Sequence, residues 1–143
     1  MRRGGRPARL LLVEDSVADA KLVALALEES GSTTQVTRVE DGVAALELLD
    51  RVLTGEALRP DLVVLDLNLP RVGGLDVLRR IKSDPDLRTV PVVVFSTSRA
   101  EVDVAAAYAC GASSYVVKPL DLHRFTEVVT SIEQYWTAVV RLP

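Results

Sequence analysis

The sequence is poor in cysteine and in aromatic residues. It has one cysteine, Cys110, and its aromatic residues are one Trp, three Tyr and two Phe among 143 residues. A lone cysteine excludes an internal disulfide framework and a cysteine-based zinc site, and it favours a reducing compartment. So few aromatic rings exclude a platform for stacking nucleic-acid bases. We therefore expect a cytoplasmic protein without disulfides or structural zinc.

Long apolar runs and an excess of basic residues are also missing. No apolar run approaches the ~18 residues that span a bilayer, and the run at 10–13 is too short for a signal peptide. The 17 basic residues are outnumbered by 20 acidic ones, which gives a formal net charge of −3. A nucleic-acid-binding domain usually has a basic surplus. We expect a soluble protein that binds neither a membrane nor nucleic acid.

The length and the ends of the chain predict a single domain. A chain of 143 residues fits one domain of ~100–200 residues and leaves no room for a separate output domain. Residues 1–8 contain three arginines, two glycines and a proline without apolar periodicity, which predicts a flexible basic arm. We expect the domain to span residues 9–136 and a short tail to follow at 137–143.

Short apolar runs alternate with helical patterns along the chain. Apolar runs typical of buried parallel strands occur at 10–13, 62–67, 90–95 and 115–117, and a more polar candidate strand lies at 35–39. Apolar residues at helical spacing fill the intervals; the fourth pattern covers 101–110 before Gly111, and the fifth begins near Asp121. Five strands and five helices predict an α/β fold, a flavodoxin-like, doubly wound five-stranded parallel sheet of order 2-1-3-4-5.

Polar residues stand where the apolar runs end. Glu14 and Asp15, then Asp66, Ser96 and Lys118, come at the carboxyl ends of four expected strands, where ligands of such sheets bind. Neighbouring carboxylates repel each other unless a cation balances them, and an oxygen-only donor set suits Mg²⁺, which also binds phosphate oxygens. The sequence therefore predicts a magnesium site open to a phosphoryl group, with Asp66 as nucleophile and Lys118 neutralising the transferred charge.

These residues resemble the motifs of the receiver domain of two-component response regulators, which has the CheY-like fold. The resemblance covers roughly residues 9–136 and rests on Val13-Glu14-Asp15, on 65–70 with Gly73-Gly74, on 91–96 and on 111–119. Each piece alone is unspecific. The pieces together, with the family's spacing between Asp66, Ser96 and Lys118, are specific.

The resemblance implies a function in a phosphorelay. It makes Asp66 the acceptor of a phosphoryl group from a sensor histidine kinase, and it places Lys118 against the phosphoryl oxygens. It also implies that Mg²⁺ is held by Glu14, Asp15 and Asp66 and by the backbone carbonyl of Asn68. The protein would then be a signalling switch, and its only catalysis would be of its own phosphorylation and dephosphorylation.

The same resemblance implies a conformational switch. Ser96 and Tyr115 match the family's switch pair, so phosphorylation would draw the Ser96 hydroxyl toward the phosphoryl group and turn Tyr115 inward, reshaping the surface around the fourth helix. The peptide bond before Pro119 is cis in the family. Thr97 is larger than the usual residue at its position, and Ser98 lacks the acid or amide that orients attacking water in some members, so we expect slow self-dephosphorylation.

Other interpretations of these residues exist. In the simplest interpretation, Glu14 and Asp15 only cap the first helix. Asp41 also follows a strand, but that strand lies away from the point where the strand order reverses, so we expect Asp41 to be only a helix cap. A haloacid-dehalogenase-type phosphatase also uses an aspartyl phosphate, Mg²⁺ and a lysine, but it needs an Asp where this chain has Asn68. A flavin-binding carrier is disfavoured because Glu14 and Asp15 would repel the flavin phosphate.

The end of the chain resembles one subgroup of the family, the stand-alone regulators of bacterial phytochrome kinases. The resemblance rests on Tyr135 and Trp136, on the apolar residues 138–143 and on a long second helical segment through Leu53 and Ala57. It implies a bacteriophytochrome as the kinase and a homodimer formed through this end of the molecule. The alternative is that residues 137–143 fold back onto their own domain.

Overall fold

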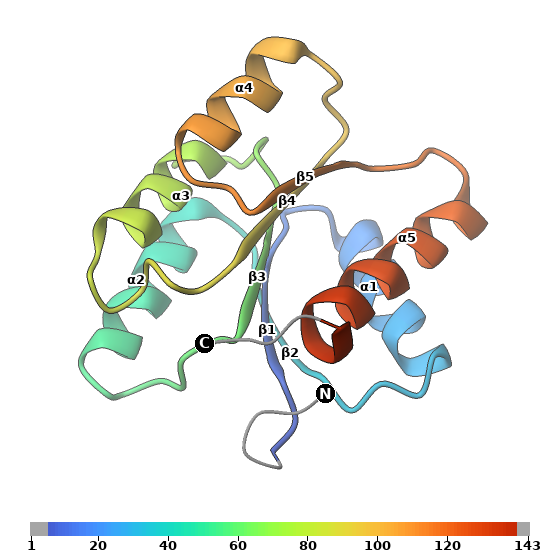
Figure 1. Cartoon of the computed structure of the whole chain (residues 1–143), viewed down its shortest axis with the longest axis horizontal. Helices are drawn as coiled ribbons and strands as arrows, with labels where there is room; N and C mark the ends of the chain where they lie inside the picture. Colours follow the sequence, from blue (N-terminus) through green and yellow to red (C-terminus); the bar gives the residue numbers. More distant parts are fainter. Residues whose placement is uncertain (1–5, 140–143) are drawn as a thin grey trace.

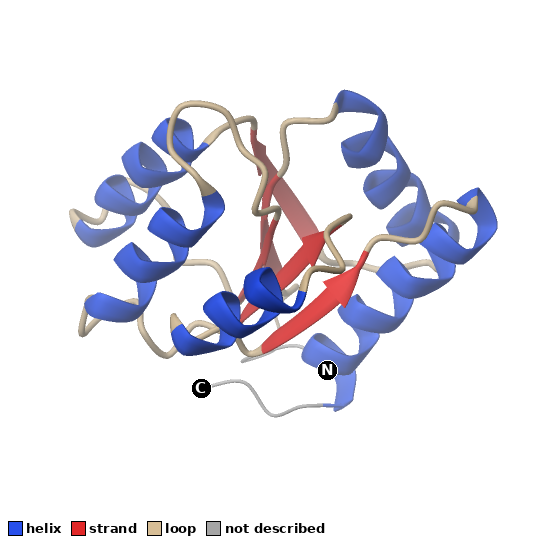
Figure 2. Ribbon diagram, turned by 90° about the horizontal axis from the view of Figure 1, so that it is seen from above, coloured by secondary structure: helices blue, strands red, loops and turns tan. Residues whose placement is uncertain are grey.

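In the computed structural model, which describes residues 6–139, the chain forms a three-layer α/β domain (Figures 1 and 2). Five parallel strands form one sheet in the order β2-β1-β3-β4-β5. Helices α1 and α5 cover one face, and α2, α3 and α4 cover the other. The predicted fold and strand order are confirmed. The strands are β1 (Arg9–Val13), β2 (Gln35–Val39), β3 (Leu62–Leu65), β4 (Val92–Ser96) and β5 (Ser114–Val117), and the helices are α1 (Val17–Glu29), α2 (Gly42–Leu53), α3 (Gly74–Ser83), α4 (Glu101–Ala109) and α5 (Leu122–Gln134).

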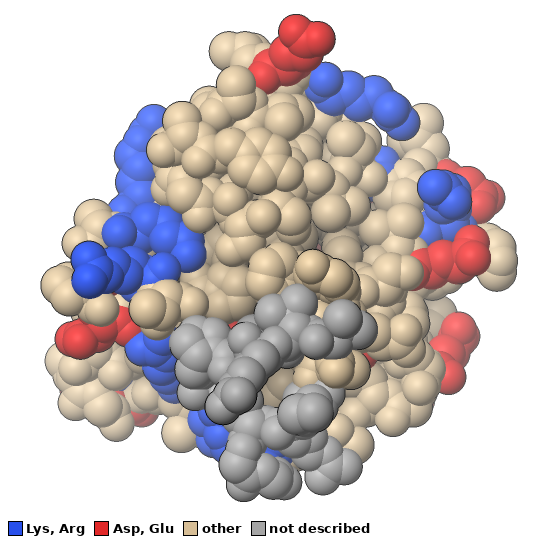
Figure 3. All heavy atoms as spheres, viewed as in Figure 1, with Lys and Arg blue, Asp and Glu red and all other residues tan. Residues whose placement is uncertain are grey.

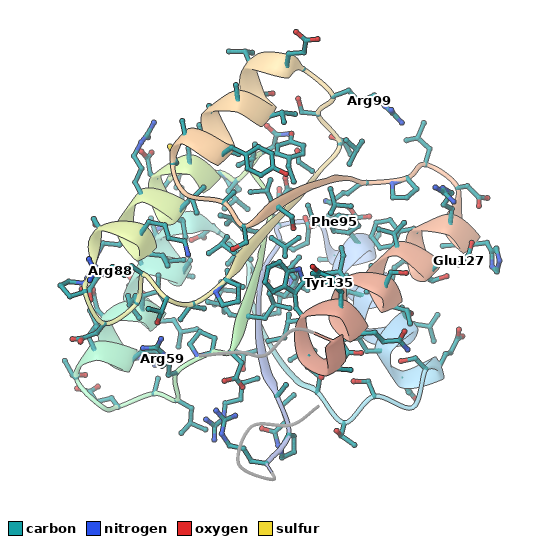
Figure 4. All side chains as sticks on the ribbon, in the orientation of Figure 1. Arg59, Arg88, Phe95, Arg99, Glu127 and Tyr135 are labelled. Carbon is teal, nitrogen blue, oxygen red and sulfur yellow. The ribbon has the colours of Figure 1, made fainter. Side chains whose placement is uncertain are left out.

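Two apolar clusters sandwich the sheet. One lies under α1 and α5 and contains Phe95 (Figure 4) and Phe125. The centroids of these two rings are 5.2 Å apart. The other lies under α2 and α3 and contains Leu11 and Leu78. Strands β3 and β4 are buried along their whole length because helices cover both of their faces, which accounts for their unbroken apolar sequences.

Side-chain caps determine where the first two helices begin. The Ser16 hydroxyl accepts a hydrogen bond from the backbone N–H of Asp19 at the start of α1. Asp41 caps α2 in the same way, as predicted. The interpretation of Glu14 and Asp15 as mere caps is therefore wrong, because the neighbouring serine performs that task.

The bounds of two strands differ from those of their apolar runs. β3 ends at Leu65 rather than at residue 67, and Asp66 follows it as the first residue outside the sheet. β4 begins at Val92 rather than at residue 90, because Pro91 has no N–H to donate to a neighbouring strand. The first shift places Asp66 just beyond the end of its strand, and the second does not affect Ser96, the last residue of β4.

Helix α2 is shorter than predicted. It ends at Leu53 and does not run through Ala57. Gly55 adopts a positive φ of 83°, and the backbone N–H of Ala57 turns back to the carbonyl of Arg51 at 3.1 Å. This turn satisfies a carbonyl at the helix end and stops the helix, because glycine adopts that conformation without steric cost.

Residues 6–8 of the predicted basic arm contact the domain. Arg6 binds Asp61 through two hydrogen bonds of 2.8 and 2.9 Å, and the carbonyl of Ala8 accepts a bond from Gln35 at 2.8 Å. Residues 6–8 are thus held against the domain, and the rest of the predicted arm lies outside the described residues.

No helix within residues 6–139 is long and apolar enough to cross a membrane.

The described part of the predicted tail continues α5. Residues Tyr135–Val139 form a π-helical turn, η2, in which the Thr137 hydroxyl donates to the Glu133 carbonyl at 2.6 Å. Trp136 packs partly buried against the cluster under α1 and α5, whereas Tyr135 is half exposed. Residues 140–143 of the predicted dimer contact lie outside the described part of the chain.

Strand β5 forms one edge of the sheet. It pairs only with β4, and its outer side faces α4. The phenolic oxygen of Tyr108, on α4, accepts a hydrogen bond of 3.0 Å from the backbone N–H of Tyr115 on this edge. A helix side chain thereby occupies a backbone donor that the sheet leaves unpaired.

Candidate functional site

The polar residues predicted from the strand ends meet at one rim of the sheet. Glu14 follows β1, Asp66 follows β3, Ser96 ends β4 and Lys118 follows β5. All four are buried, with exposures of 0 to 7%. Asp15, next to Glu14, is exposed. The parallel strands bring these residues together because their carboxyl ends share one edge.

Three carboxylates form a group that fits a metal ion. One oxygen each from Glu14, Asp15 and Asp66 lies within 4.8 Å of the others. An all-oxygen donor set with one exposed member suits a hard divalent cation that keeps some of its water. The residues present therefore fit the metal predicted from the sequence.

Lys118 lies among carboxylates. Its Nζ donates to Glu14 Oε1 at 2.6 Å, to Asp19 Oδ2 at 2.8 Å and to Asp66 Oδ2 at 2.9 Å. Burial would lower the pKa of Lys118, but the hydrogen bonds to the three carboxylates outweigh this effect and raise the pKa. The side chain is thus held as a cation beside Asp66, and its Nζ also lies 5.8 Å from the Phe95 ring centroid.

At Glu14 the effect of burial on the pKa outweighs that of the hydrogen bonds. Burial raises its pKa to about 7, although the hydrogen bond from Lys118 opposes this rise. A carboxyl group that holds its proton near neutrality lacks enough positive charge around it. A divalent cation at this group would supply that charge.

Asp66 is fixed by its backbone surroundings. Its Oδ1 accepts a bond of 3.0 Å from the Asn68 N–H, while Oδ2 faces Lys118. A Cβ at Gly74 would come within 2.3 Å of the Asp66 carbonyl oxygen, so the start of α3 packs directly against the Asp66 backbone. The Gly73-Gly74 pair thus has a steric reason: only a residue without a side chain fits at the second position.

Ser96 and Tyr115 lie around the loop between β4 and α4. The Ser96 hydroxyl accepts a bond from the Ser98 N–H at 3.2 Å, and the Tyr115 hydroxyl donates to the Ser98 carbonyl at 2.9 Å. The Lys118 N–H donates to the Ser96 carbonyl at 2.8 Å. Ser98 thus connects the two residues of the predicted switch pair, and Arg99, beside it, extends outward (Figure 4).

Two residues at the rim were missed in the sequence. Asp19 binds Lys118 from the first turn of α1, and the Arg38 guanidinium donates to the backbone carbonyls of Glu14 and Asp15 at 3.0 and 3.2 Å. The position of Asp19 one helical turn after Asp15 is a signal that could have found it. Arg38 offered none, because it lies within a strand and acts on backbone atoms.

One expectation at the rim is wrong. Among residues 6–139 no peptide bond is cis, so the bond before Pro119 is trans. Trans is the preferred isomer even before proline, by ~0.5–1 kcal/mol. The geometry around Lys118 described above is reached with this isomer.

Comparisons with known proteins identify the family of the chain. Residues 10–130 match the model of the response regulator receiver domain family. The chain is 41% identical over 138 residues to response regulator Rcp1 of Synechocystis sp., covering 96% of this chain and 94% of Rcp1. The probable methanogenesis regulatory protein FilR2 of Methanothrix harundinacea is 40% identical over 137 residues, covering 96% of this chain and 88% of FilR2.

Solved structures extend the similarity to three dimensions. The phosphorylated cyanobacterial phytochrome response regulator RcpA superposes with a TM-score of 0.91 at 40% identity, and the Mn²⁺-bound form of Rcp1 with 0.89 at 40% identity; each match covers 96% of this chain and 99% of the other. The bacteriophytochrome response regulator RtBRR gives 0.74 at 36% identity, with coverage of 96% and 85%. The chain therefore belongs to the response regulator receiver domain family, as a CheY-like receiver of the phytochrome type.

Proposed function

We propose that this chain accepts a phosphoryl group on Asp66 from a sensor histidine kinase and changes its surface in response. The observation that carries the proposal is the contact of Lys118 with Asp66 beside two further carboxylates of the candidate metal group. Two relatives support it, since one is described as phosphorylated and another as bound to Mn²⁺.

Transfer needs few groups from the protein. An oxygen of the Asp66 carboxylate attacks phosphorus, the bond from phosphorus to the kinase histidine nitrogen breaks, and that nitrogen keeps the electron pair. Lys118 neutralises charge on the phosphoryl oxygens. The Asn68 N–H, which binds Asp66 Oδ1, orients the carboxylate.

We assign Mg²⁺ to the group formed by Glu14, Asp15 and Asp66, with the backbone carbonyl of Asn68 as a fourth ligand. When bound, Mg²⁺ stabilises the charge that develops on the transferred phosphoryl oxygens. Glu14 and Asp66 are buried while Asp15 is exposed. Asp15 is therefore the carboxylate at the entrance, and the buried pair holds the inner side of the site.

The switch is proposed to run from Ser96 through Ser98 to α4. The hydroxyl of Ser96 turns from the Ser98 N–H toward the phosphoryl oxygens, and Tyr115 then leaves the Ser98 carbonyl and turns inward. Both movements release the loop that precedes α4. The output is the changed shape of this helix and its surroundings.

We propose a bacteriophytochrome as the kinase and a homodimer as the assembled form. The phytochrome response regulators among the similar structures support the first. The second is supported by the face around β5, α4 and α5, where uncharged atoms fill the middle and charged side chains lie at the rim (Figure 3). Val102, Tyr108 and Tyr135 are exposed apolar or aromatic side chains of these helices and of the turn after α5.

The haloacid-dehalogenase-type phosphatase is not supported. Its acid/base position is occupied by Asn68, whose amide cannot exchange a proton with a leaving group. The family assignment also points to a signalling protein.

The test of the phosphoacceptor is intact mass after incubation with acetyl phosphate and Mg²⁺. The native chain should gain one phosphoryl group, and Asp66→Asn should gain none. Asp76→Asn, which changes an exposed acid on α3, is the matched control and should behave like the native chain. Absence of a gain in the native chain, or an equal gain in Asp66→Asn, would overturn the proposal.

The partner proposals need separate measurements. A bacteriophytochrome kinase carrying a labelled phosphoryl group on its histidine should pass the label to the native chain faster than a histidine kinase of another sensor class does. Light scattering should give twice the mass of the chain, and Tyr135→Arg should lower it, because a charge would enter the apolar contact. A monomer at high concentration would exclude the homodimer.

A further inference from the structure

All the donors of Lys118 are engaged in the unphosphorylated protein. An ammonium group has three N–H donors, and all three of its partners here are carboxylates, from Glu14, Asp19 and Asp66. Phosphorylation turns the Asp66 carboxylate into an acyl phosphate, so the phosphoryl oxygens take over the donor that Asp66 held. The phosphoryl group carries more negative charge than that carboxylate, and it competes for the ammonium group with the two carboxylates that remain, Glu14 and Asp19. The question is which of these two gives way.

The three carboxylates differ in burial and in position. The side chains of Glu14 and Asp66 are 3 and 9% exposed, whereas that of Asp19 is 28% exposed. Glu14 and Asp66 also belong to the candidate metal group, and Asp19 does not. In the phosphorylated protein, loss of the lysine contact would leave the buried Glu14 carboxylate poorly solvated, while water can replace the lysine at Asp19.

Asp19 has further support that does not depend on Lys118. It lies in the first turn of α1, where the N-terminal end of the helix dipole stabilises a negative charge. Asp19 and Lys118 also line one surface hollow together with Thr97 and Leu120, and Leu120 is almost fully exposed. The Asp19 carboxylate thus has water and a favourable dipole when it separates from the lysine.

We propose that Asp19 is a positioning residue that holds Lys118 beside Asp66 in the unphosphorylated protein and releases it when Asp66 is phosphorylated. This inference rests on the function proposed above. Asp19 does not touch the phosphoryl group itself; it competes with that group for the same ammonium donors. The strength of this contact sets how readily the phosphorylated form accumulates.

The test compares phosphorylated fractions at a fixed, subsaturating concentration of acetyl phosphate with Mg²⁺, measured by intact mass. Asp19→Asn removes the competing charge, so the ratio of phosphorylated to unphosphorylated chain should rise about fivefold, as expected for loss of one partly exposed ion pair. Asp76→Asn removes an equivalent first-turn acid from α3 and should leave the ratio unchanged. Circular dichroism of each variant verifies folding, and Asp19→Ser provides a second uncharged replacement.

A double variant distinguishes an effect of Asp19 through Lys118 from a general effect of its charge. In a Lys118→Met background, Asp19→Asn should no longer change the ratio, whereas a general effect of charge would persist. The affinity for Mn²⁺ should stay within about threefold of the native value, because Asp19 is not a ligand. An unchanged or lower ratio in Asp19→Asn, an effect that persists without Lys118, or a large loss of Mn²⁺ affinity would overturn the inference. Failure of the native chain to gain any phosphoryl group would instead overturn the proposed function.

Discussion

The Tyr115 hydroxyl donates a hydrogen bond of 2.9 Å to the backbone carbonyl of Ser98, so the outermost strand holds the loop that precedes α4. We predict that Tyr115→Phe loosens this loop. The substitution keeps the aromatic ring but removes the hydroxyl, so the Ser98 carbonyl loses its hydrogen-bond donor. Amide exchange at residues 97–104 should accelerate, and stability should fall by about 1 kcal/mol. Tyr135→Phe, at a half-exposed tyrosine on the turn after α5, is the control. Equal exchange in the two variants would contradict the prediction.

Gly74 gives a steric prediction for the phosphoacceptor loop. Gly74→Ala places a Cβ within 2.3 Å of the Asp66 carbonyl oxygen, so backbone must shift. We expect a loss of about 1–3 kcal/mol in urea unfolding and slower phosphorylation by acetyl phosphate. Gly73→Ala is the matched control, because its Cβ would meet nothing within 4 Å. If both variants unfold at the same urea concentration, the close approach has no energetic effect.

The raised pKa of Glu14 predicts that metal affinity depends on pH. Its folded pKa of about 7 lies above its ordinary value of 4.5, so the metal-free fold holds an extra proton between these values. This contribution to stability is complete below pH 4.5 and is lost as the pH rises through 7. Mg²⁺ must displace that proton, so its affinity should rise from pH 5 to about pH 8 and then level off.

Calorimetric titration with Mg²⁺ at several pH values measures this dependence. Glu14→Gln should bind more weakly and should lose most of the rise with pH, because the titrating group is gone. An equally steep rise in Glu14→Gln would assign the proton to another group.

Arg38 predicts a structural contribution to the same affinity. Its guanidinium binds the carbonyls of Glu14 and Asp15, and its removal should let the acidic segment move. We expect Arg38→Ala to weaken Mg²⁺ binding about threefold to tenfold, as for loss of a group that orients metal ligands. Arg79→Ala, which breaks an exposed pair with Asp76, should leave binding unchanged.

The lifetime of the phosphorylated form provides the last prediction. Ser98 donates through its hydroxyl to Asp103, so the position that could orient attacking water carries no acid or amide and is turned toward α4. We expect a half-life well beyond seconds at neutral pH, and Ser98→Glu should shorten it. Decay of the native phosphorylated chain within seconds would refute this expectation. Intact mass at intervals after removal of acetyl phosphate gives both values.

The strand ends were the most predictable part of the molecule. Asp66 and Lys118 were recognisable because each follows a short apolar run, and parallel strands bring such positions to one edge. The strand order followed from the alternation of the same runs with helical patterns. These positions were predictable because the local apolar pattern marks each strand end and the parallel topology places all the strand ends at one edge.

Contacts between segments were less predictable. Arg38 binds backbone carbonyls that follow another strand, and no local pattern encodes such a contact. For Asp19, which binds Lys118, the spacing from Asp15 was the one local signal. The pairing of Arg6 with Asp61 likewise joins residues far apart in the chain. Helix α2 was predicted too long because its apolar pattern continues past Gly55, where a positive φ ends it.

Tyr108 bears on how this molecule associates with others. A bare edge strand invites another chain to add a strand through its unpaired backbone groups. With the Tyr115 N–H occupied by a phenol from α4, an incoming strand would have to displace a helix side chain before it could pair. A partner that approaches the β5 edge therefore meets a side chain of α4 at this backbone donor before it reaches the strand.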